Sequence, residues 1–211
     1  MKKIYIHPLP VRIWHWVNAL GFLLMIVTGV QIRYLDFFEL MSFRTAVVVH
    51  NWTGFVLIAN FFLWFCFYMF TDKISVYLPE LNPQKYFEDS WRQIKFYGYG
   101  IFLGEENPHH PTAYHKFNPL QIMMYQIIML LFVPLQFVSG LLLWDINRFA
   151  VVVALLGGVR VVDTVHVLMF IVFCGFLLMH WYLITLGHTR FAHIKAMLTG
   201  YEEIPDHPKH G

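Results

Sequence analysis

Four histidines lie inside long apolar stretches of the sequence, where a polar side chain is costly and usually functional. They are His15, His50, His166 and His180. Imidazole nitrogen is a common metal ligand. His166 and His180 are fourteen residues apart in one stretch. In a helix this spacing separates them by about 21 Å along the axis, on faces within about 40° of each other. A single helix therefore offers an imidazole near each of its ends.

The elements that must position these histidines are membrane-length helices. A hydrocarbon core about 30 Å thick needs about 20 apolar residues to cross it. Four stretches meet that length, at residues 13–32, 46–70, 120–144 and 161–186. The chain has 211 residues, of which 58% are hydrophobic and 13% charged, whereas soluble domains average about 25% charged. The sequence therefore predicts an all-α fold: residues 1–211 form one integral membrane four-helix bundle.

The connections between these helices differ in charge. Eleven of the fifteen Lys and Arg residues lie before residue 13, between residues 71 and 119, or after residue 186. The other four lie in the two remaining connections. Cytoplasmic loops of membrane proteins carry the excess of positive charge. We therefore expect the N-terminus, the C-terminus and the loop at 71–119 to face the cytoplasm. Within the loop, residues 82–102 mix charge with aromatics and could lie on the membrane surface.

With this orientation the histidines sort by depth into two pairs. His15 and His180 lie near the cytoplasmic side, and His50 and His166 lie near the outer side. Two imidazoles from facing helices can supply both axial positions of a haem iron, and helix bundles commonly hold cofactors in this way. Such an iron has no open position and transfers single electrons. The chain lacks C-x-x-C-H, so the sequence predicts two b-type haems rather than covalently attached c-type haem.

Two other interpretations of the histidines stay open. A lone intramembrane histidine is often a hydrogen-bonded packing residue, although matching pairs make this account weaker. The chain could also be a non-haem transporter of protons or metal, which uses intramembrane histidines as well. Such pathways normally include carboxylates, and Asp163 at the outer edge is the one acidic residue in the spans.

Several neighbours of the histidines are candidates for contact with haem. Gly54 and Gly175 would leave room for a flat macrocycle, although glycines also serve close helix packing. Haem propionates need cationic or hydrogen-bonding partners. The candidates are Arg12 and Arg190 at the inner face, and Arg33, Arg44 and Arg160 at the outer face. Each arginine could equally be an anchor that reaches the membrane surface.

Four motifs make the sequence resemble the di-haem cytochrome b subunits of respiratory oxidoreductases. They are R-x-x-H-W at Arg12–Trp16, H-x-x-x-G at His50–Gly54, H-x13-H at His166–His180, and KFNPLQ at Lys116–Gln121. That family includes the gamma subunit of formate dehydrogenase, nickel–iron hydrogenase cytochrome b and thiosulfate reductase cytochrome b. The resemblance covers nearly the whole chain. Hydrogenase subunits more often show G-H-N-P, from which this chain departs at Lys116 and Phe117.

The resemblance implies where the cofactors and the quinone bind. His15 and His180 would ligate the inner haem, and His50 and His166 the outer haem. A quinone, which we expect to be menaquinone, would bind beside the cytoplasmic haem. Asn118, Gln121 and Lys116 would lie at this site, with Lys116 or His115 delivering protons. Asn118 and Pro119 also have a plain structural interpretation, as a helix N-cap followed by proline in the first turn.

The resemblance also implies partners. It places the chain in the cytoplasmic membrane of a bacterium or archaeon. Only two cysteines are present, Cys66 and Cys174, too few for an iron–sulfur cluster. The substrate-specific catalytic site would therefore lie on another chain, reached through an iron–sulfur or multihaem subunit at the outer face. A net charge of +2 argues against a nucleic-acid partner. His109 and His110 could form a surface metal site or belong to a solvated loop.

Overall fold

The computed structural model describes residues 2–71, 78, 81–109, 117–187 and 189–204. Among these residues, four helices are long and apolar enough to cross a membrane. They are α1 (Leu9–Arg33), α2 (Phe43–Met69), the continuous helix Pro119–Trp144, and α7 (Val159–Ile184). The third is built from α4 (Pro119–Ile127), a π-helical turn η3 (Ile128–Phe132) and α5 (Val133–Trp144). The predicted helical bundle is confirmed, and no helix end differs from its predicted position by more than four residues.

The helix starts follow from local sequence. Leu9 and Pro10 open α1, and a proline in the first turn suits a helix because its missing N–H would have no partner there. Ser42 caps α2, because its hydroxyl accepts from the backbone N–H of Thr45 at 3.2 Å. The positive φ of Gly158, 96°, sets the turn into α7. Hydropathy alone starts these helices later, because Arg12 and Thr45 in the first turns lower it.

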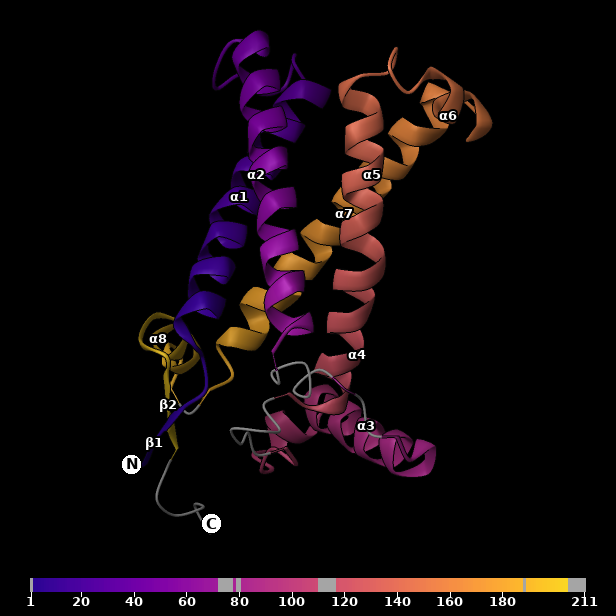
Figure 1. The fold of residues 1–211 in the computed structure, drawn as a ribbon. Helices are drawn as coiled ribbons and strands as arrows, with labels where there is room; N and C mark the ends of the chain where they lie inside the picture. Colours follow the sequence, from indigo (N-terminus) through magenta and orange to yellow (C-terminus); the bar gives the residue numbers. More distant parts are fainter. Residues whose placement is uncertain (1, 72–77, 79–80, 110–116, 188, 205–211) are drawn as a thin grey trace.

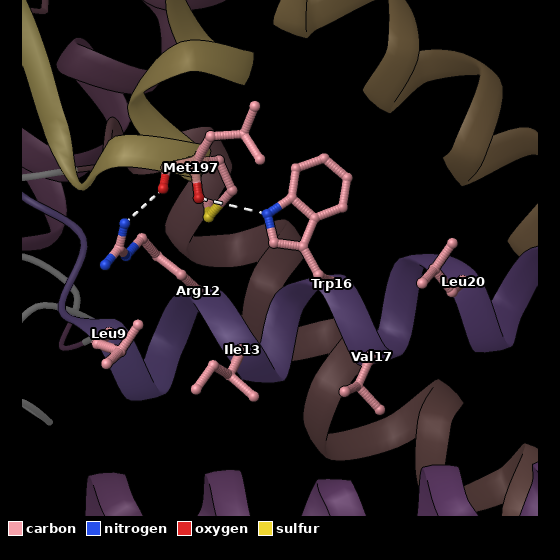
Figure 2. Close-up of a pocket in the computed structure, with 8 residues that line it drawn as sticks. Leu9, Arg12, Ile13, Trp16, Val17, Leu20 and Met197 are labelled. Atoms are coloured by element: carbon pink, nitrogen blue, oxygen red, sulfur yellow. Dashed lines mark hydrogen bonds between the residues drawn. The ribbon is translucent and has the colours of Figure 1, made fainter.

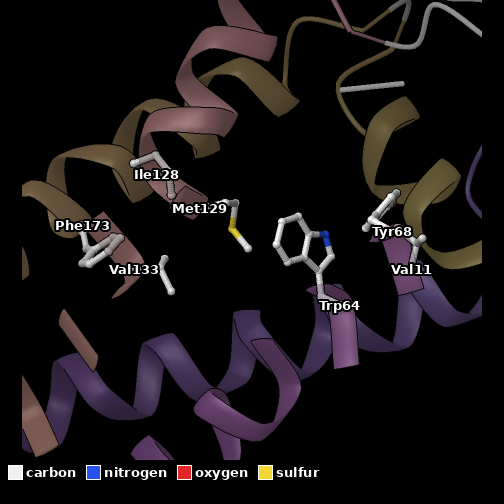
Figure 3. Packing of buried hydrophobic residues seen from close by; sticks show 7 residues of the cluster. All are labelled: Val11, Trp64, Tyr68, Ile128, Met129, Val133 and Phe173. Carbon is white, nitrogen blue, oxygen red and sulfur yellow. The ribbon is translucent and has the colours of Figure 1, made fainter. Parts of the chain in front are cut away.

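The four long helices alternate in direction and form a bundle (Figure 1). Helix α1 packs against α2, α5 packs against α7, and α2 contacts α5. A buried cluster packs between these helices (Figure 3). Its members are Val11, Trp64, Tyr68, Ile128, Met129, Val133 and Phe173. Many other large apolar side chains are exposed, among them Leu20, Leu63 and Leu178. Exposure of so many large apolar side chains suits helices that are surrounded by lipid tails rather than by water.

The two ends of the bundle carry different small elements (Figure 1). At one end, the short helix α6 (Ala150–Leu155) connects α5 to α7. At the other end lie α3 (Pro83–Gly98), the 3-10 turn η2 (Gly100–Leu103) and α8 (Ala192–Thr199). Helix α3 falls within residues 82–102, the segment expected to lie on the membrane surface, and it contacts α4. Its position at a membrane stays a prediction. With six residues, helix α6 is too short to span a membrane.

A two-stranded sheet, which no sequence pattern predicted, pairs a segment before α1 with a segment after α8. Strands β1 (Lys2–Tyr5) and β2 (Tyr201–Ile204) pair antiparallel, with Lys3 opposite Glu203 and Tyr5 opposite Tyr201. The carboxylate Oε1 of Glu203 lies 2.8 Å from Nζ of Lys195 and 3.8 Å from Nζ of Lys3. The pairing holds α8 at the start of α1, close to the first histidine.

Candidate functional site

The structure brings the four intramembrane histidines together in two pairs. The ring centres of His15, on α1, and His180, on α7, are 6.2 Å apart, and the ring planes make an angle of 50°. The ring centres of His50, on α2, and His166, on α7, are 6.4 Å apart, at 67°. All four rings are half-buried. Helix α7 contributes one histidine to each pair, one near its start and one near its end.

The spacing within each pair fits two imidazoles on opposite sides of one metal ion. A metal–imidazole bond is about 2 Å long, and a ring nitrogen lies about 1 Å from the centre of its ring. Two axial imidazoles therefore place their centres about 6 Å apart. The observed 6.2 and 6.4 Å match this value. A direct N–H···N bond would bring the centres to about 5 Å. Both donor sets therefore fit bis-histidine ligation of haem.

A hydroxyl group fixes the tautomer of His50. Thr28 Oγ1 donates its proton to the carbonyl of Leu24 at 2.7 Å. The same oxygen lies 2.9 Å from Nδ1 of His50. A hydroxyl has one proton to donate, so His50 Nδ1–H is the donor in the second bond. The lone pair of the ring then lies on Nε2, the nitrogen left for a metal.

A second hydroxyl does the same for His166. Ser139 Oγ donates to the carbonyl of Gln136 at 3.1 Å and lies 3.0 Å from Nδ1 of His166. His166 Nδ1–H therefore donates to Ser139. The amide Nε2 of Gln136 donates to His166 Nε2 at 3.2 Å, so the ring lone pair lies on Nε2. A metal ion bound at this nitrogen would replace the Gln136 amide. Thr28, Ser139 and Gln136 were missed by the sequence analysis, because hydroxyl and amide residues in membrane helices have many ordinary roles.

Aromatic side chains border the other pair. The ring of His15 meets the edge of Trp16, with centres 5.2 Å apart at 90°. The ring of His180 stacks on Phe176, with centres 5.8 Å apart at 19°. The Trp16 indole N–H donates to the carbonyl of Met197, on α8, at 3.3 Å. Helix α8 therefore braces the side chain that borders His15.

A cavity of about 350 Å³ lies between α1 and α8 (Figure 2). Its walls are Leu9, Arg12, Ile13, Trp16, Val17, Leu20, Met197 and Leu198. The Arg12 guanidinium, expected near a haem propionate, donates to the carbonyl of Leu198. Its Nε is buried without a hydrogen-bond partner among the described residues. Arg12 thus connects α1 to α8 while retaining one unused donor.

The remaining arginine candidates lie on the surface. Arg33, at the end of α1, pairs with Asp163 of α7, with 3.2 Å between Nη1 and Oδ2. This ion pair ties α1 to α7 at the end of the bundle nearest His50 and His166. Arg44, Arg160 and Arg190 are exposed. The propionate roles of these arginines stay predictions.

The glycines beside the imidazoles are Gly29 and Gly140, whereas the room that Gly54 and Gly175 would leave for a macrocycle stays a prediction. A Cβ added at Gly54 would meet Met25 at 3.8 Å, and one at Gly175 would meet nothing within 4 Å. A Cβ at Gly29 would instead lie 3.4 Å from His50 Cε1, and one at Gly140 would lie 3.2 Å from His166 Cε1. Gly29 and Gly140 therefore make room for the rings.

Asn118 and Gln121 form a reciprocal capping box at the start of α4. Asn118 Oδ1 accepts from the Gln121 backbone N–H at 2.9 Å, and Gln121 Oε1 accepts from the Asn118 N–H at 3.0 Å. The Asn118 amide also donates to the Tyr97 hydroxyl at 3.0 Å. Burial raises the pKa of the Tyr97 phenol above its ordinary value, so Tyr97 stays protonated. The structural interpretation of Asn118 is therefore present, and a quinone role would be additional.

Three of the candidate residues in the loop lie outside the part of the chain that the structure describes. They are Lys116, His115 and His110. The backbone N–H of His109 donates to Oδ1 of Asn107 at 3.0 Å, so His109 belongs to a folded turn after η2.

The four apolar helices and the paired imidazoles define a class of protein, the membrane proteins that hold haem between helices. A model of the family described as Prokaryotic cytochrome b561 matches residues 6–200, and the chain belongs to this family. It is a multi-pass membrane b-type cytochrome that functions in electron transport. The resemblance inferred from the sequence motifs is thereby confirmed.

Similar proteins carry cytochrome names. "Putative cytochrome YdhU" of Escherichia coli (strain K12) is 34% identical over 205 residues, covering 95% of this chain and 75% of that protein. A "Probable Ni/Fe-hydrogenase B-type cytochrome subunit" of Azotobacter vinelandii is 23% identical, covering 96% of this chain and 90% of that protein. One of the same name from Rhodobacter capsulatus is 28% identical, covering 56% of this chain and 46% of that protein.

Proposed function

We propose that this cytochrome is the electron-transfer and quinone-reactive subunit of a respiratory oxidoreductase complex. It exchanges electrons with a partner subunit at the outer face and with a quinone, menaquinone in our proposal, near the cytoplasmic face. The observation that carries the proposal is the presence of two histidine pairs, with ring centres 6.2 and 6.4 Å apart, towards opposite ends of the bundle. A single pair would serve one membrane surface, whereas two pairs serve both.

In this proposal the chain holds two haem b groups. His15 and His180 ligate the inner one, and His50 and His166 ligate the outer one. Bound in this way, haem b supplies an iron that gains and loses single electrons without an open coordination position. The protein's own part is to present four neutral imidazoles from three helices at fixed depths and to keep water from them. Arg12, with its unused Nε, is the described arginine best suited to a propionate of the inner haem.

The orientation in the membrane is also part of the proposal. The positive-inside rule directs the end with β1, β2, α3 and α8 to the cytoplasm. Lys3 and Lys195, whose side chains meet Glu203, lie at this end. The end with α6, His50 and His166 then faces outwards. Both termini would be cytoplasmic.

The catalytic partner is proposed from sequence and from relatives. The chain contains two cysteines, fewer than a four-cysteine iron–sulfur cluster needs. Relatives from Azotobacter vinelandii and Rhodobacter capsulatus are named as hydrogenase cytochrome subunits. We propose that an iron–sulfur or multihaem subunit docks at the outer face and links this chain to a catalytic subunit. The partner's substrate then sets the direction of electron flow.

A haem count on the purified chain tests the proposal. We expect two b-type haems per chain by pyridine haemochrome quantitation, and we expect a menaquinol analogue to reduce the protein. Protein from haem-replete cells that contains no haem would overturn the proposal and favour a proton or metal transporter. Two haems that no quinol analogue reduces would leave an electron carrier without a quinone site.

Gln121 is the residue whose contact with quinone can be separated from its role in folding. Its Oε1 completes the capping box, and no described residue accepts from its Nε2. We expect Gln121→Glu to keep the capping box, which glutamate forms equally well, and both haems. The lost donor and the added charge should slow reduction by the menaquinol analogue roughly tenfold, because a hydrogen bond contributes about 1 kcal/mol and an unmatched partner costs more.

The matched control is Asn82→Asp, which adds the same charge at the cap of α3. There the Asn82 side chain accepts from the backbone N–H groups of Gln84 and Lys85, a role that aspartate fills. Its quinol kinetics should equal those of the unmodified protein. Unchanged kinetics in Gln121→Glu would exclude Gln121 from the quinone site.

A further inference from the structure

Both histidines of the outer pair, His50 and His166, are contacted by a hydroxyl residue that a glycine follows in the sequence. On α1, Thr28 accepts the His50 Nδ1–H at 2.9 Å, and Gly29 is the next residue. On α5, Ser139 accepts the His166 Nδ1–H at 3.0 Å, and Gly140 is the next residue. We call these two hydroxyl–glycine pairs the outer cradle. They lie on different helices, yet each places a hydroxyl at Nδ1 and a glycine beside Cε1 of its ring.

The hydroxyl groups of the outer cradle are deeply buried. Thr28 is 0% exposed and Ser139 is 4% exposed. Each hydroxyl already bonds a carbonyl of its own helix, at 2.7 and 3.1 Å respectively. Serine and threonine in helices are normally satisfied by such a bond alone. The second bond, to a ring nitrogen, therefore depends on where the neighbouring helix places its histidine, and it occurs at both outer ligands.

The inner pair lacks this arrangement at His180. Among the residues that the structure describes, His180 makes no hydrogen bond, and its ring stacks on Phe176. The space beside Gly175, five residues earlier on α7, is open. The two ends of α7 thus hold their imidazoles differently, His166 by a hydroxyl and a glycine, and His180 by an aromatic ring.

We propose that Thr28 and Ser139 are positioning residues that lower the reduction potential of the outer haem. This inference rests on the proposed function, in which His50 and His166 ligate that haem. A ring that donates its Nδ1–H to an oxygen becomes a more basic ligand at Nε2. A more basic ligand favours ferric over ferrous iron, so the potential falls, and hydrogen bonding around ligands is a known means of tuning it. Gly29 and Gly140 permit the ring orientation in which these bonds form.

The test is a redox titration of the purified full-length cytochrome that resolves both haems. The variants are Thr28→Val, Ser139→Ala and the two combined. The control is Thr164→Val, which removes a bond from Thr164 Oγ1 to the Arg160 carbonyl of 2.8 Å on α7 without touching a histidine. His50→Leu identifies the outer haem as the one that it removes. Thr28→Ser restores a hydroxyl at the same place.

We expect each single variant to keep two haems and to raise the midpoint potential of the outer haem, with the largest rise in the double variant. The inner haem and the Thr164→Val variant should keep their potentials, and Thr28→Ser should keep the potential of the unmodified protein. Selective loss of the outer haem from Thr28→Val, reversed in Thr28→Ser, would also support the inference. A double variant with both haems and both potentials unchanged would overturn it. If His50→Leu retained two haems, the ligand assignment itself would fail instead.

Discussion

Leucine in place of His166 is expected to lower the haem content of the purified protein from two haems to one, and His180→Leu to do the same for the other haem. The two rings lie at opposite ends of α7, and each stands 6.2 to 6.4 Å from a single partner ring. A b-type haem is held by its axial bonds and by packing, and no covalent thioether link retains it when one axial bond is lost. The double variant should be colourless.

The two single variants should differ in quinone chemistry. Our proposal places the quinone near His15 and His180, so His180→Leu should abolish reduction by a menaquinol analogue. His166→Leu should retain quinol-driven reduction of its one remaining haem. Absorbance difference spectra, recorded with quinol and then with dithionite, separate the two cases. The reverse pattern would put the quinone at the other membrane surface.

His193→Leu is the matched control for both variants. His193 lies on α8, where its Nδ1 is 3.7 Å from the Glu202 carboxylate, and it belongs to neither histidine pair. It should leave two haems and normal quinol kinetics. Two haems in His166→Leu or His180→Leu would show that the paired histidines are packing residues rather than ligands.

Gly140→Leu is expected to expel the outer haem while leaving the inner one bound. A Cβ at this position would already lie 3.2 Å from Cε1 and 3.7 Å from Nδ1 of His166. Three further carbons would push the ring away from His50 and break its bond to Ser139. Overpacking of this kind typically costs about 1–3 kcal/mol, and here the ring is the part that gives way. Haem content and the potential of the remaining haem measure the effect.

Val138→Leu controls for added bulk on the same helix. Val138 is 54% exposed and points away from the bundle interior, so both haems should remain. Gly29→Ala should act in the same sense as Gly140→Leu but more weakly, because its Cβ would lie 3.4 Å from His50 Cε1. Two haems with an unchanged outer potential in Gly140→Leu would refute the close fit between Gly140 and the ring.

The helices and the histidine pairs could be predicted from the sequence because both depend on distance along single helices. Apolar length predicts a span, and a fourteen-residue spacing places His166 and His180 towards opposite ends of α7. Direction then follows from alternation, so depth could be assigned to His15 and His50 as well. The helix starts were placed late because hydropathy does not register a first-turn proline such as Pro10 or a hydroxyl cap such as Ser42.

The contacts around the rings depended on how neighbouring helices are rotated, which hydropathy does not encode. Thr28 and Ser139 look like ordinary small polar residues of membrane helices, and only the packing of α1 on α2 and of α5 on α7 brings them to a ring. The sequence did hold one local signal: in both Thr28-Gly29 and Ser139-Gly140 a hydroxyl residue is followed directly by a glycine. The sheet between Lys2–Tyr5 and Tyr201–Ile204 joins segments too short and too distant in sequence to predict.

The π-helical turn Ile128–Phe132 separates two stretches of one membrane helix, to which the proposed function gives different roles. A π turn accommodates one residue more than α-helical winding, and each residue turns the helix by about 100°. Pro134, just beyond it, has no N–H to complete a regular ladder, which favours the wider turn. The side of the helix on which Ser139 and Gly140 lie is therefore offset from the side that regular α-helical winding from Asn118 and Gln121 would give. Gain or loss of one residue here would rotate the α5 half of this helix and leave the α4 half in place. Under the proposed function, such a change would alter the surroundings of the haem held by His50 and His166 and leave the proposed quinone site at Asn118 and Gln121 unchanged.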